Sequence, residues 1–337
     1  MRFQTTLAGS YPKLPSRTGD VNLRVVLNRR DQGKASDEDV TAAVRETTRR
    51  VLSIGERAGL DILMDGGIAW EDAQTYVARG LDGFRIAGLI RYLDTNTYYR
   101  QPEIVGPVKW TKPITVADYK AATEMTKKPV KAFLPGPYSL YRFSKDLHYG
   151  DAIEACEDLG AALAREITAL EEAGAAWIHI EEPWLGRASR MAEVHGGFEA
   201  SVIRAAFFPL LEKRKARVVV HVPFRAPNEI YAAIVNIPGW HTIGLDLVEG
   251  TAGWDLLPKI PKERGVALGL IDARNTKMED PAQVARLAKR AAELRPDLEF
   301  QITPTASLEY LPADKAEAKV GRLVEAARMA SQNGGSR

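Results

Sequence analysis

The chain has 337 residues, of which 45% are hydrophobic, and its formal net charge is +2. This near-neutral balance gives no indication of a nucleic-acid partner. No apolar stretch is long enough to span a bilayer, and the N-terminal residues lack the apolar core of a signal peptide. The single cysteine, Cys156, excludes an internal disulfide and a zinc site with two thiolates from one chain. The sequence therefore predicts a cytoplasmic protein that acts on a small-molecule substrate; it does not indicate an oligomeric state.

Short apolar runs recur along the chain, and most end at a polar residue beside Gly or Pro. The eight runs are residues 3–7, 62–64, 130–134, 177–180, 218–220, 243–245, 266–271 and 298–302. Continuous apolar runs of this length are typical of strands buried on both faces of a parallel sheet. Eight of them, separated by helical patterns, predict an α/β fold of the (β/α)8 TIM-barrel type. The active site of such a barrel lies at the C-terminal ends of its strands. We expect one such domain over residues 1–337.

Helical patterns separate these runs. Ser36 and Asp39 predict a capping pair for a helix over 37–58, which Gly59 ends. Cys156 lies near the apolar stripe of a second helix and is expected to be a buried, inert thiol. A flexible tail is predicted at 331–337. The remaining helices are predicted over residues 151–173, 198–212, 228–235, 280–294 and 314–329.

The gap between the second and third runs is too long for a single crossover helix. Residues 67–128 are therefore expected to be an insertion over the catalytic face. Such an insertion either forms a lid or packs without contacting the ligand. Within it, residues 103–105 and 108–110 are predicted to pair as a hairpin.

Two adjacent carboxylates, Glu181 and Glu182, follow the fourth run. Because side chains alternate along a strand, one of them is expected to face the pocket while the other anchors a loop. Charged groups are costly to bury unless they are paired. The position of the two glutamates at the end of an apolar strand therefore favours a functional role. The alternative is a structural ion pair to an arginine such as Arg187.

Ionisable residues also end the next three runs. His221 could bind a metal, transfer protons or bind an anion, and the alternative is a hydrogen-bonded core histidine. Asp246 and Asp272 could each instead cap the helix that follows. His179, in the middle of its strand, is interpreted as structural. We find no phosphate loop, dinucleotide fingerprint or nucleophile elbow.

The order of these motifs resembles the catalytic barrel of the cobalamin-independent methionine synthase family, especially its short single-barrel members. The matching segments run in family order over nearly the whole chain. They are AGSYP at 8–12, DGG at 65–67, LPGPYS at 134–139, IEEP at 180–183, His221, Asp246, DARNT at 272–276 and PTASLEYLP at 304–312.

The resemblance implies a zinc-dependent reaction whose metal ligands are only partly present here. In that family, zinc activates homocysteine as a thiolate, which takes a methyl group from a folate or another donor. The zinc is held by a His-x-Cys pair, a carboxylate and a later cysteine. His221 and Asp246 match the histidine and the carboxylate. Pro223 and Ala306 stand where the two cysteines are expected.

Two further positions depart from the family pattern. Its Asp-Gly-Glu reads Asp65-Gly66-Gly67, and Glu181 replaces an aspartate that helps to hold the amino group of homocysteine. Proline and alanine cannot bind a metal, so the sequence predicts neither tight zinc binding nor any other cofactor. A harder metal could still bind through His221 and Asp246, with Glu181 or Glu182 and water.

Three functions are therefore open. The first is an enzyme whose site contains no thiolate, in which His221, Asp246 and Glu181 catalyse C–S or C–O cleavage, decarboxylation or alkyl transfer by acid–base chemistry. The second is a methyltransferase that makes methionine from homocysteine without the usual zinc site. The third is a non-catalytic, ligand-binding barrel. The charged residues at the strand ends favour an enzyme, either a transferase or a lyase.

The catalytic pair is expected to be His221 and Glu181, both at the rim of the barrel, with His221 titrating near neutral pH. Arg274 is expected to hold a substrate carboxylate. The full set of residues expected to bind the substrate is Ser10, Tyr11, Asp65, Tyr138, Glu182, Asp272, Arg274, Asn275 and Thr305.

Overall fold

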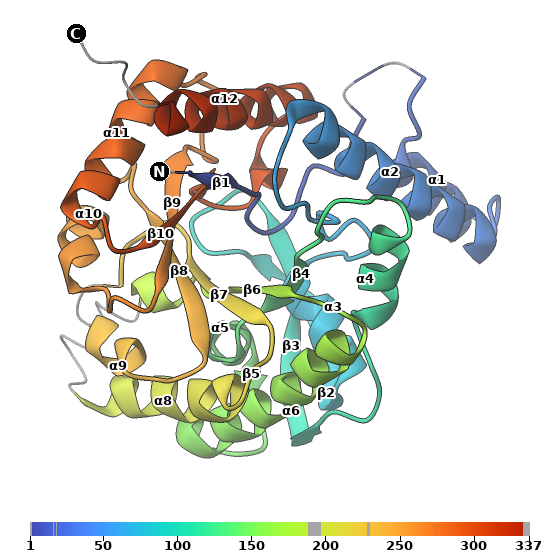
Figure 1. Cartoon of the computed structure of the whole chain (residues 1–337). Coiled ribbons are helices and arrows are strands. Elements are labelled where there is room, and N and C mark those ends of the chain that lie inside the picture. Colours follow the sequence, from blue (N-terminus) through green and yellow to red (C-terminus); the bar gives the residue numbers. More distant parts are fainter. Residues whose placement is uncertain (1, 16, 18, 188–196, 228–229, 333–337) are drawn as a thin grey trace, which may run out of the picture.

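Seven strands form one parallel sheet that curls into a barrel (Figure 1). The structure is a computed structural model that describes residues 2–332 except 16, 18, 188–196 and 228–229. The strands follow the order β1 (Gln4–Thr5), β10 (Glu299–Pro304), β9 (Gly265–Ile271), β8 (Trp240–Asp246), β7 (Arg217–Val222), β6 (Trp177–Glu181) and β4 (Ala132–Pro135).

A very short eighth segment closes the ring between β1 and β4. Thr6 forms a parallel bridge with Ile62, and Leu63 forms one with Val130. The Ile62 N–H donates to the Thr5 carbonyl at 3.1 Å, and the Lys131 N–H donates to the Leu63 carbonyl at 2.8 Å. All eight apolar runs therefore contribute to the barrel wall, and the predicted (β/α)8 barrel is confirmed.

Helices surround the sheet (Figure 1). The predicted cap of the first long helix is confirmed, because Ser36 and Asp39 form a capping box and Gly59 ends the helix at φ +97°. Cys156 is a free, buried cysteine. The longer helices are α1 (Leu23–Asp31), α2 (Asp37–Ala58), α6 (Ala152–Glu172), α8 (Gly197–Leu211), α11 (Pro281–Leu294) and α12 (Ala313–Ser331).

Shorter helices lie between these elements. They are α3 (Ala73–Gly80), α4 (Val116–Thr123), α5 (Pro137–Phe143), α9 (Tyr231–Val235), α10 (Ala252–Leu256) and the 3-10 turns Leu257–Lys259 and Leu308–Tyr310. The first two residues of the predicted helix 228–235 lie outside the described residues, as does the predicted tail from residue 333 onward. None of the described helices has the length and hydropathy needed to cross a membrane.

Residues 67–128 contain a long antiparallel hairpin. Strand β2 (Asp82–Arg91) pairs with β3 (Tyr98–Lys109), and β5 (Lys145–Asp146) adds to β3 in parallel. The predicted hairpin between 103–105 and 108–110 is wrong, because both segments belong to β3 and Glu103 pairs with Arg85. The chain does not turn at Gly106-Pro107, since an irregularity of the opposite strand at Gly83, with φ +89°, accommodates these residues.

Candidate functional site

A cavity of about 100 Å³ lies where the hairpin tip meets the C-terminal ends of the strands. Glu181 is the last residue of β6, and Ser10 and Glu309 follow β1 and β10. Tyr92 and Tyr99 come from the hairpin, and the Tyr92 ring stacks on Phe143 at 4.8 Å. The residues lining the cavity are Ser10, Glu71, Asp72, Ala73, Gln74, Tyr92, Thr97, Tyr98, Tyr99, Glu181, Glu309 and Tyr310.

This cavity is strongly acidic. Four of its lining residues are carboxylates, and none of the described side chains that line it is basic. Glu71 pairs with Arg79 at 2.5 Å and Asp72 accepts from the Thr75 N–H at 2.7 Å, whereas Glu181 and Glu309 have no such backbone or arginine partner among the described contacts. Burial, followed by repulsion from Glu309, raises the pKa of Glu181 to about 8. Burial also raises the pKa of Glu309 and of Asp72 above their usual ranges. A cationic group in the cavity would offset the cost of burying these charges.

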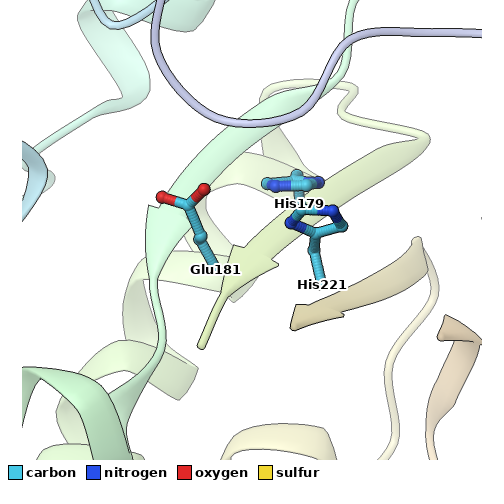
Figure 2. A group of neighbouring side chains, drawn as sticks. All are labelled: His179, Glu181 and His221. Carbon is cyan, nitrogen blue, oxygen red and sulfur yellow. The ribbon is translucent and has the colours of Figure 1, made fainter. Parts of the chain in front are cut away.

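Glu181 also faces two histidines inside the barrel (Figure 2). One donor atom from each of His179, Glu181 and His221 lies within 4.8 Å of the other two, and all three side chains are buried. His179 and Glu181 are two positions apart along β6, so both face the same side of the strand. His221 is the register partner of Glu181 on β7. Adjacent strands therefore bring the three side chains together.

In the described part of the chain, most ring nitrogens of His179 and His221 lack a hydrogen-bond partner. Within the described part of the chain, neither ring nitrogen of His221 has a hydrogen-bond partner, and the same is true of Nδ1 of His179. Nε2 of His179 accepts a hydrogen bond of 3.3 Å from the Gly9 N–H. Buried polar groups normally have partners, so the orphaned nitrogens indicate that this cluster is built for something besides core packing.

Burial also determines the charge of these rings. It lowers the pKa of His221 to about 3, and the nearby Lys131 ammonium lowers it further. The expectation that His221 lies at the rim and titrates near neutral pH is therefore wrong. The ring is 0% exposed, and it stays neutral at physiological pH. Lys131 is itself buried, and its Nζ donates to the Leu7 carbonyl at 2.9 Å.

Two glycines, which have no side chain, make room for the side chains of His221 and Glu181. A Cβ on Gly244 of β8 would clash with Cδ2 of His221. Gly9 has φ +58°, and a Cβ on it would lie 2.6 Å from Oε1 of Glu181. The position of the cluster therefore depends on the close approach of neighbouring backbone.

Glu182 points away from the cavity and anchors a loop. Its carboxylate accepts hydrogen bonds from the Tyr138 and Ser139 N–H groups, at 3.1 and 2.8 Å, and from the Ser139 hydroxyl. The Tyr138 hydroxyl donates to Glu199 of α8. The structure thus supports the expected division between Glu181 and Glu182, but it leaves Glu182 and Tyr138 without contact to the cavity. Arg187 pairs with Asp94 rather than with either glutamate.

The remaining polar residues at the strand ends cap their own loops. Asp246 accepts from the Val248 and Glu249 N–H groups at 2.9 and 3.1 Å. Asp272 accepts from the Arg274 N–H at 2.8 Å and from the Asn275 side chain. Thr305 Oγ1 accepts from the Ala273 N–H. These residues are absent from the cavity lining, and Asp246 is also absent from the cluster with His221.

Arg274 lines a second opening of about 310 Å³. Arg187, Arg225, Trp184 and Phe224 also line it, and Arg274 forms an ion pair with Glu249. Asp94 and Glu249 line it as well, and they pair with Arg187 and Arg274, so this aromatic opening is mixed in charge. An anion would have to displace Glu249 from Arg274, which lies away from Glu309 and Asp72.

Of the three N-terminal candidates, Ser10 alone lines the cavity. Tyr11 is buried, and the charges that affect its hydroxyl come from Glu317 and from two arginines of α2. Asp65 accepts from the Gly67 N–H at 3.1 Å. A Cβ on Gly67 would lie 3.1 Å from Ser10 Oγ, so a glutamate side chain at this position would start beside Ser10.

The sequence interpretation missed three residues of the site. His179 was assigned a structural role, although its two-residue spacing from Glu181 was a usable signal. Glu309 lies in the family-like segment 304–312, which was a usable signal, whereas Asp72 comes from the loop before α3 and no local pattern marks it. Glu309 supplies a carboxylate to the cavity.

The residues present do not fit the zinc centre that the family resemblance implies. Pro223 and Ala306 offer no side-chain donor, and Oδ1 of Asp246 accepts from two backbone N–H groups. His221 is the one matching ligand that faces the interior cluster.

Comparisons with known proteins agree with this architecture. The model of the family described as "Cobalamin-independent synthase, Catalytic domain" matches residues 3–329. A methionine synthase of Saccharolobus solfataricus is 28% identical over 96% of this chain and 94% of its own length. The 5-methyltetrahydropteroyltriglutamate–homocysteine methyltransferase of Bacillus licheniformis is 26% identical over 97% of this chain and 42% of its own.

Among solved structures, a B12-independent methionine synthase from a Shewanella species, in complex with selenomethionine, shares the fold. Its TM-score is 0.78 at 21% identity, over 97% of both chains. A putative vitamin-B12-independent methionine synthase from Listeria monocytogenes gives a TM-score of 0.76 at 16% identity, also over 97% of both chains. The family match covers nearly the whole chain, and the relatives are named as transferases. The chain is therefore an enzyme that belongs to the cobalamin-independent synthase catalytic-domain family.

Proposed function

We propose that this enzyme transfers a methyl group to the sulfur of a small amino-acid thiol of the homocysteine type, at a site without thiolate ligands. The observation that carries this proposal is the acidic cavity, whose described lining contains four carboxylates and no basic side chain. The substrate ammonium binds beside Glu309, with Ser10 lining the same cavity. Its thiol then extends toward Glu181, at the inner end of the cavity.

The second opening suits the methyl donor. A cavity of about 100 Å³ is small for a pterin-sized ligand, because pockets for such ligands are roughly 300–1,000 Å³. The second opening, of about 310 Å³, combines Trp184 and Phe224 with three arginines, which suits an aromatic donor whose carboxylates exchange with Asp94 and Glu249 as partners of Arg187 and Arg274. In the reaction, the sulfur forms a bond to the methyl carbon and the bond between that carbon and the donor breaks. The thiol proton ends on the donor.

We also propose that residues 67–128 act as a lid on a single catalytic domain. The support is that Tyr92, Thr97, Tyr98 and Tyr99, near the hairpin tip, form one wall of the cavity. Tyr99 is tied to the barrel side by a hydrogen bond of 2.8 Å from its hydroxyl to the Phe143 carbonyl. A small-molecule substrate and a cytoplasmic location stay predictions.

The test is to incubate the purified full-length chain with homocysteine and methyl-labelled 5-methyltetrahydropteroyl mono- and triglutamate. Labelled methionine, detected by mass spectrometry, is the expected product. The desamino analogue, 4-mercaptobutanoate, should react roughly 10²-fold less efficiently, because it leaves the buried carboxylates without a partner. Glu309→Gln should remove most of this preference, whereas Glu293→Gln on the exposed face of α11 should keep it.

A second candidate is favoured by the loss of both cysteine ligands at Pro223 and Ala306. A site without thiolates could instead cleave a C–S or C–O bond, decarboxylate its substrate or transfer another alkyl group by acid–base chemistry. Release of sulfide or carbon dioxide from an amino-acid substrate, without labelled methionine, would favour this reaction and reject methyl transfer.

A further inference from the structure

The two histidines inside the barrel have no part in holding the proposed substrate. Their rings lie 5.1 Å apart between centroids, and His221 is fully buried. Nδ1 of each ring lacks a hydrogen-bond partner among the described residues. A neutral imidazole always offers one nitrogen lone pair, which needs a donor or a metal ion. The lone pair of His221 has no donor among the described residues, whereas that of His179 is on Nε2 and accepts a long bond of 3.3 Å from the Gly9 N–H. A cation in the cluster would complement the His221 lone pair and would compete with the Gly9 N–H for that of His179.

Glu181 supplies a carboxyl group for such a cation, and a bound cation would favour its ionised form. Its carboxylate is 5% exposed and accepts a hydrogen bond of 3.3 Å from Ser307 Oγ. No salt bridge joins it to a described basic side chain, and its nearest charged influence is another carboxylate, Glu309. Buried charges in proteins are normally paired or bound to metals.

The spacing of the three donors is close to that of a metal site. Three atoms that lie within 4.8 Å of one another all lie within about 2.8 Å of a common point. Metal–nitrogen and metal–oxygen bonds to zinc are about 2.0–2.2 Å, so each donor needs to move by less than about 1 Å. Figure 2 shows both rings and the carboxylate turned toward one another.

We propose that His179, Glu181 and His221 bind a divalent transition-metal ion. Two imidazoles and a carboxylate form a donor set found in catalytic zinc sites and in non-haem iron(II) sites, both of which keep an open position. This set shares His221 with the family's zinc centre, but it uses two residues of β6 in place of the missing cysteines. Metal binding is measured without substrate, so the site does not depend on the reaction proposed above.

Lys131 offers an independent test of the metal site. Its buried amine is close enough to influence both histidines, and its positive charge opposes a cation in the cluster. Lys131→Met removes this charge while leaving the three donors in place. The variant should therefore bind the metal more tightly than the wild type, which would not be expected if the histidines were only packing residues.

The experiment uses the full-length protein after treatment with a chelator. Zn²⁺ is titrated by calorimetry, Fe²⁺ is titrated without oxygen, and Co²⁺ is followed by its visible absorption. One ion per chain is expected, and the cobalt complex should lack thiolate-to-metal charge-transfer absorption. His179→Asn, His221→Asn and Glu181→Gln should each weaken binding by more than roughly 10²-fold, since even residues behind the ligands cost 10–100-fold. His148→Asn, at an exposed histidine, is the matched control.

A ligand variant would also lose metal binding if it misfolded. A variant that keeps all three donors therefore provides a second test of the site. Gly244→Ala introduces a methyl group against His221 and should weaken binding by displacing the ring. Its control is Gly321→Ala, because a Cβ on Gly321 meets nothing within 4 Å. Failure of all three ions to bind would overturn the proposal. Binding that survives the ligand variants, or that the His148 change abolishes, would do the same.

Discussion

Two groups of acidic residues lie at the C-terminal ends of the same barrel, and they differ in how their oxygens are used. Glu182, Asp246 and Asp272 each accept hydrogen bonds from N–H groups of nearby loops. Glu181 and Glu309 line the cavity instead, and each lies near the other's charge. The position of a carboxylate at a strand end therefore does not identify a functional residue. Whether backbone donors already satisfy it is the better guide.

The largest expected effect is on catalysis, and it separates Glu181 from its neighbour. Glu181→Gln should lower kcat/KM by roughly 10²-fold or more, the scale of a lost charged group in an active site. Glu182→Gln keeps one of the two oxygen acceptors for the loop, and it should have a much smaller effect on kcat/KM because Glu182 does not line the cavity. Steady-state kinetics of the two variants checks this, and equal losses would remove the distinction between them.

A second prediction concerns folding stability. Glu182→Ala leaves the Tyr138 and Ser139 N–H groups and the Ser139 hydroxyl without their acceptor in a buried position. Each unsatisfied group costs about 1–3 kcal/mol, so the free energy of unfolding should fall by at least about 3 kcal/mol. Urea unfolding measures this loss. An unchanged midpoint would show that the loop does not depend on the carboxylate.

The third prediction is a pH dependence at Asp246. Burial, despite the hydrogen bonds from Val248 and Glu249, raises the pKa of Asp246 from 3.8 to about 6. A carboxyl group whose pKa is higher in the folded state stabilises the fold below pH 3.8, and this contribution is lost as the pH rises through about 6.

Asp246→Asn removes that titration and keeps one oxygen acceptor. Between pH 4 and pH 7, the stability of the variant relative to the wild type should therefore rise by up to about 3 kcal/mol. Thermal or urea unfolding at the two pH values gives the comparison. A difference that is the same at both pH values would contradict the shifted pKa.

The smallest effect is expected at Asp272, which is partly exposed. Asp272→Asn keeps an acceptor for the Arg274 N–H and should cost less than about 1 kcal/mol of stability. Its kcat/KM should change by no more than a few-fold. A large loss of kcat/KM in this variant would show that Asp272 acts in the active site and does not only cap its loop.

The barrel could be predicted from the sequence because seven of the eight apolar runs end within two residues of the end of a strand, and the run 62–64 forms bridges to both neighbours. The separation of Glu181 from Glu182 followed from the alternation of side chains alone. The hairpin register could not be predicted, since a bulge at Gly83 lets the chain pass Gly106-Pro107 without turning. Glu309 and Asp72 reach the cavity through loops, and their approach depends on the whole fold.

The burial of His221 could not be predicted from the sequence, for a different reason. Its place at a strand end could be predicted, but its burial depends on Gly244 of the next strand and on the closed barrel around it. His179 was given a structural role because it lies mid-strand. In a barrel, however, a mid-strand side chain can face a polar interior rather than an apolar layer. Here the interior also holds Lys131, Gln301 and Thr303.

The short segment that closes the barrel has a consequence for dynamics. Ile62 and Leu63 are joined to their neighbours by one isolated bridge on each side, whereas β7, β8 and β9 form continuous ladders. Amide hydrogens at this seam should exchange with solvent sooner than those of the opposite wall, because fewer cooperative bonds must break to expose them. The hairpin that covers the cavity follows this seam in the chain. Opening the seam would therefore loosen the cover while β6 and β7 keep His179, Glu181 and His221 in place.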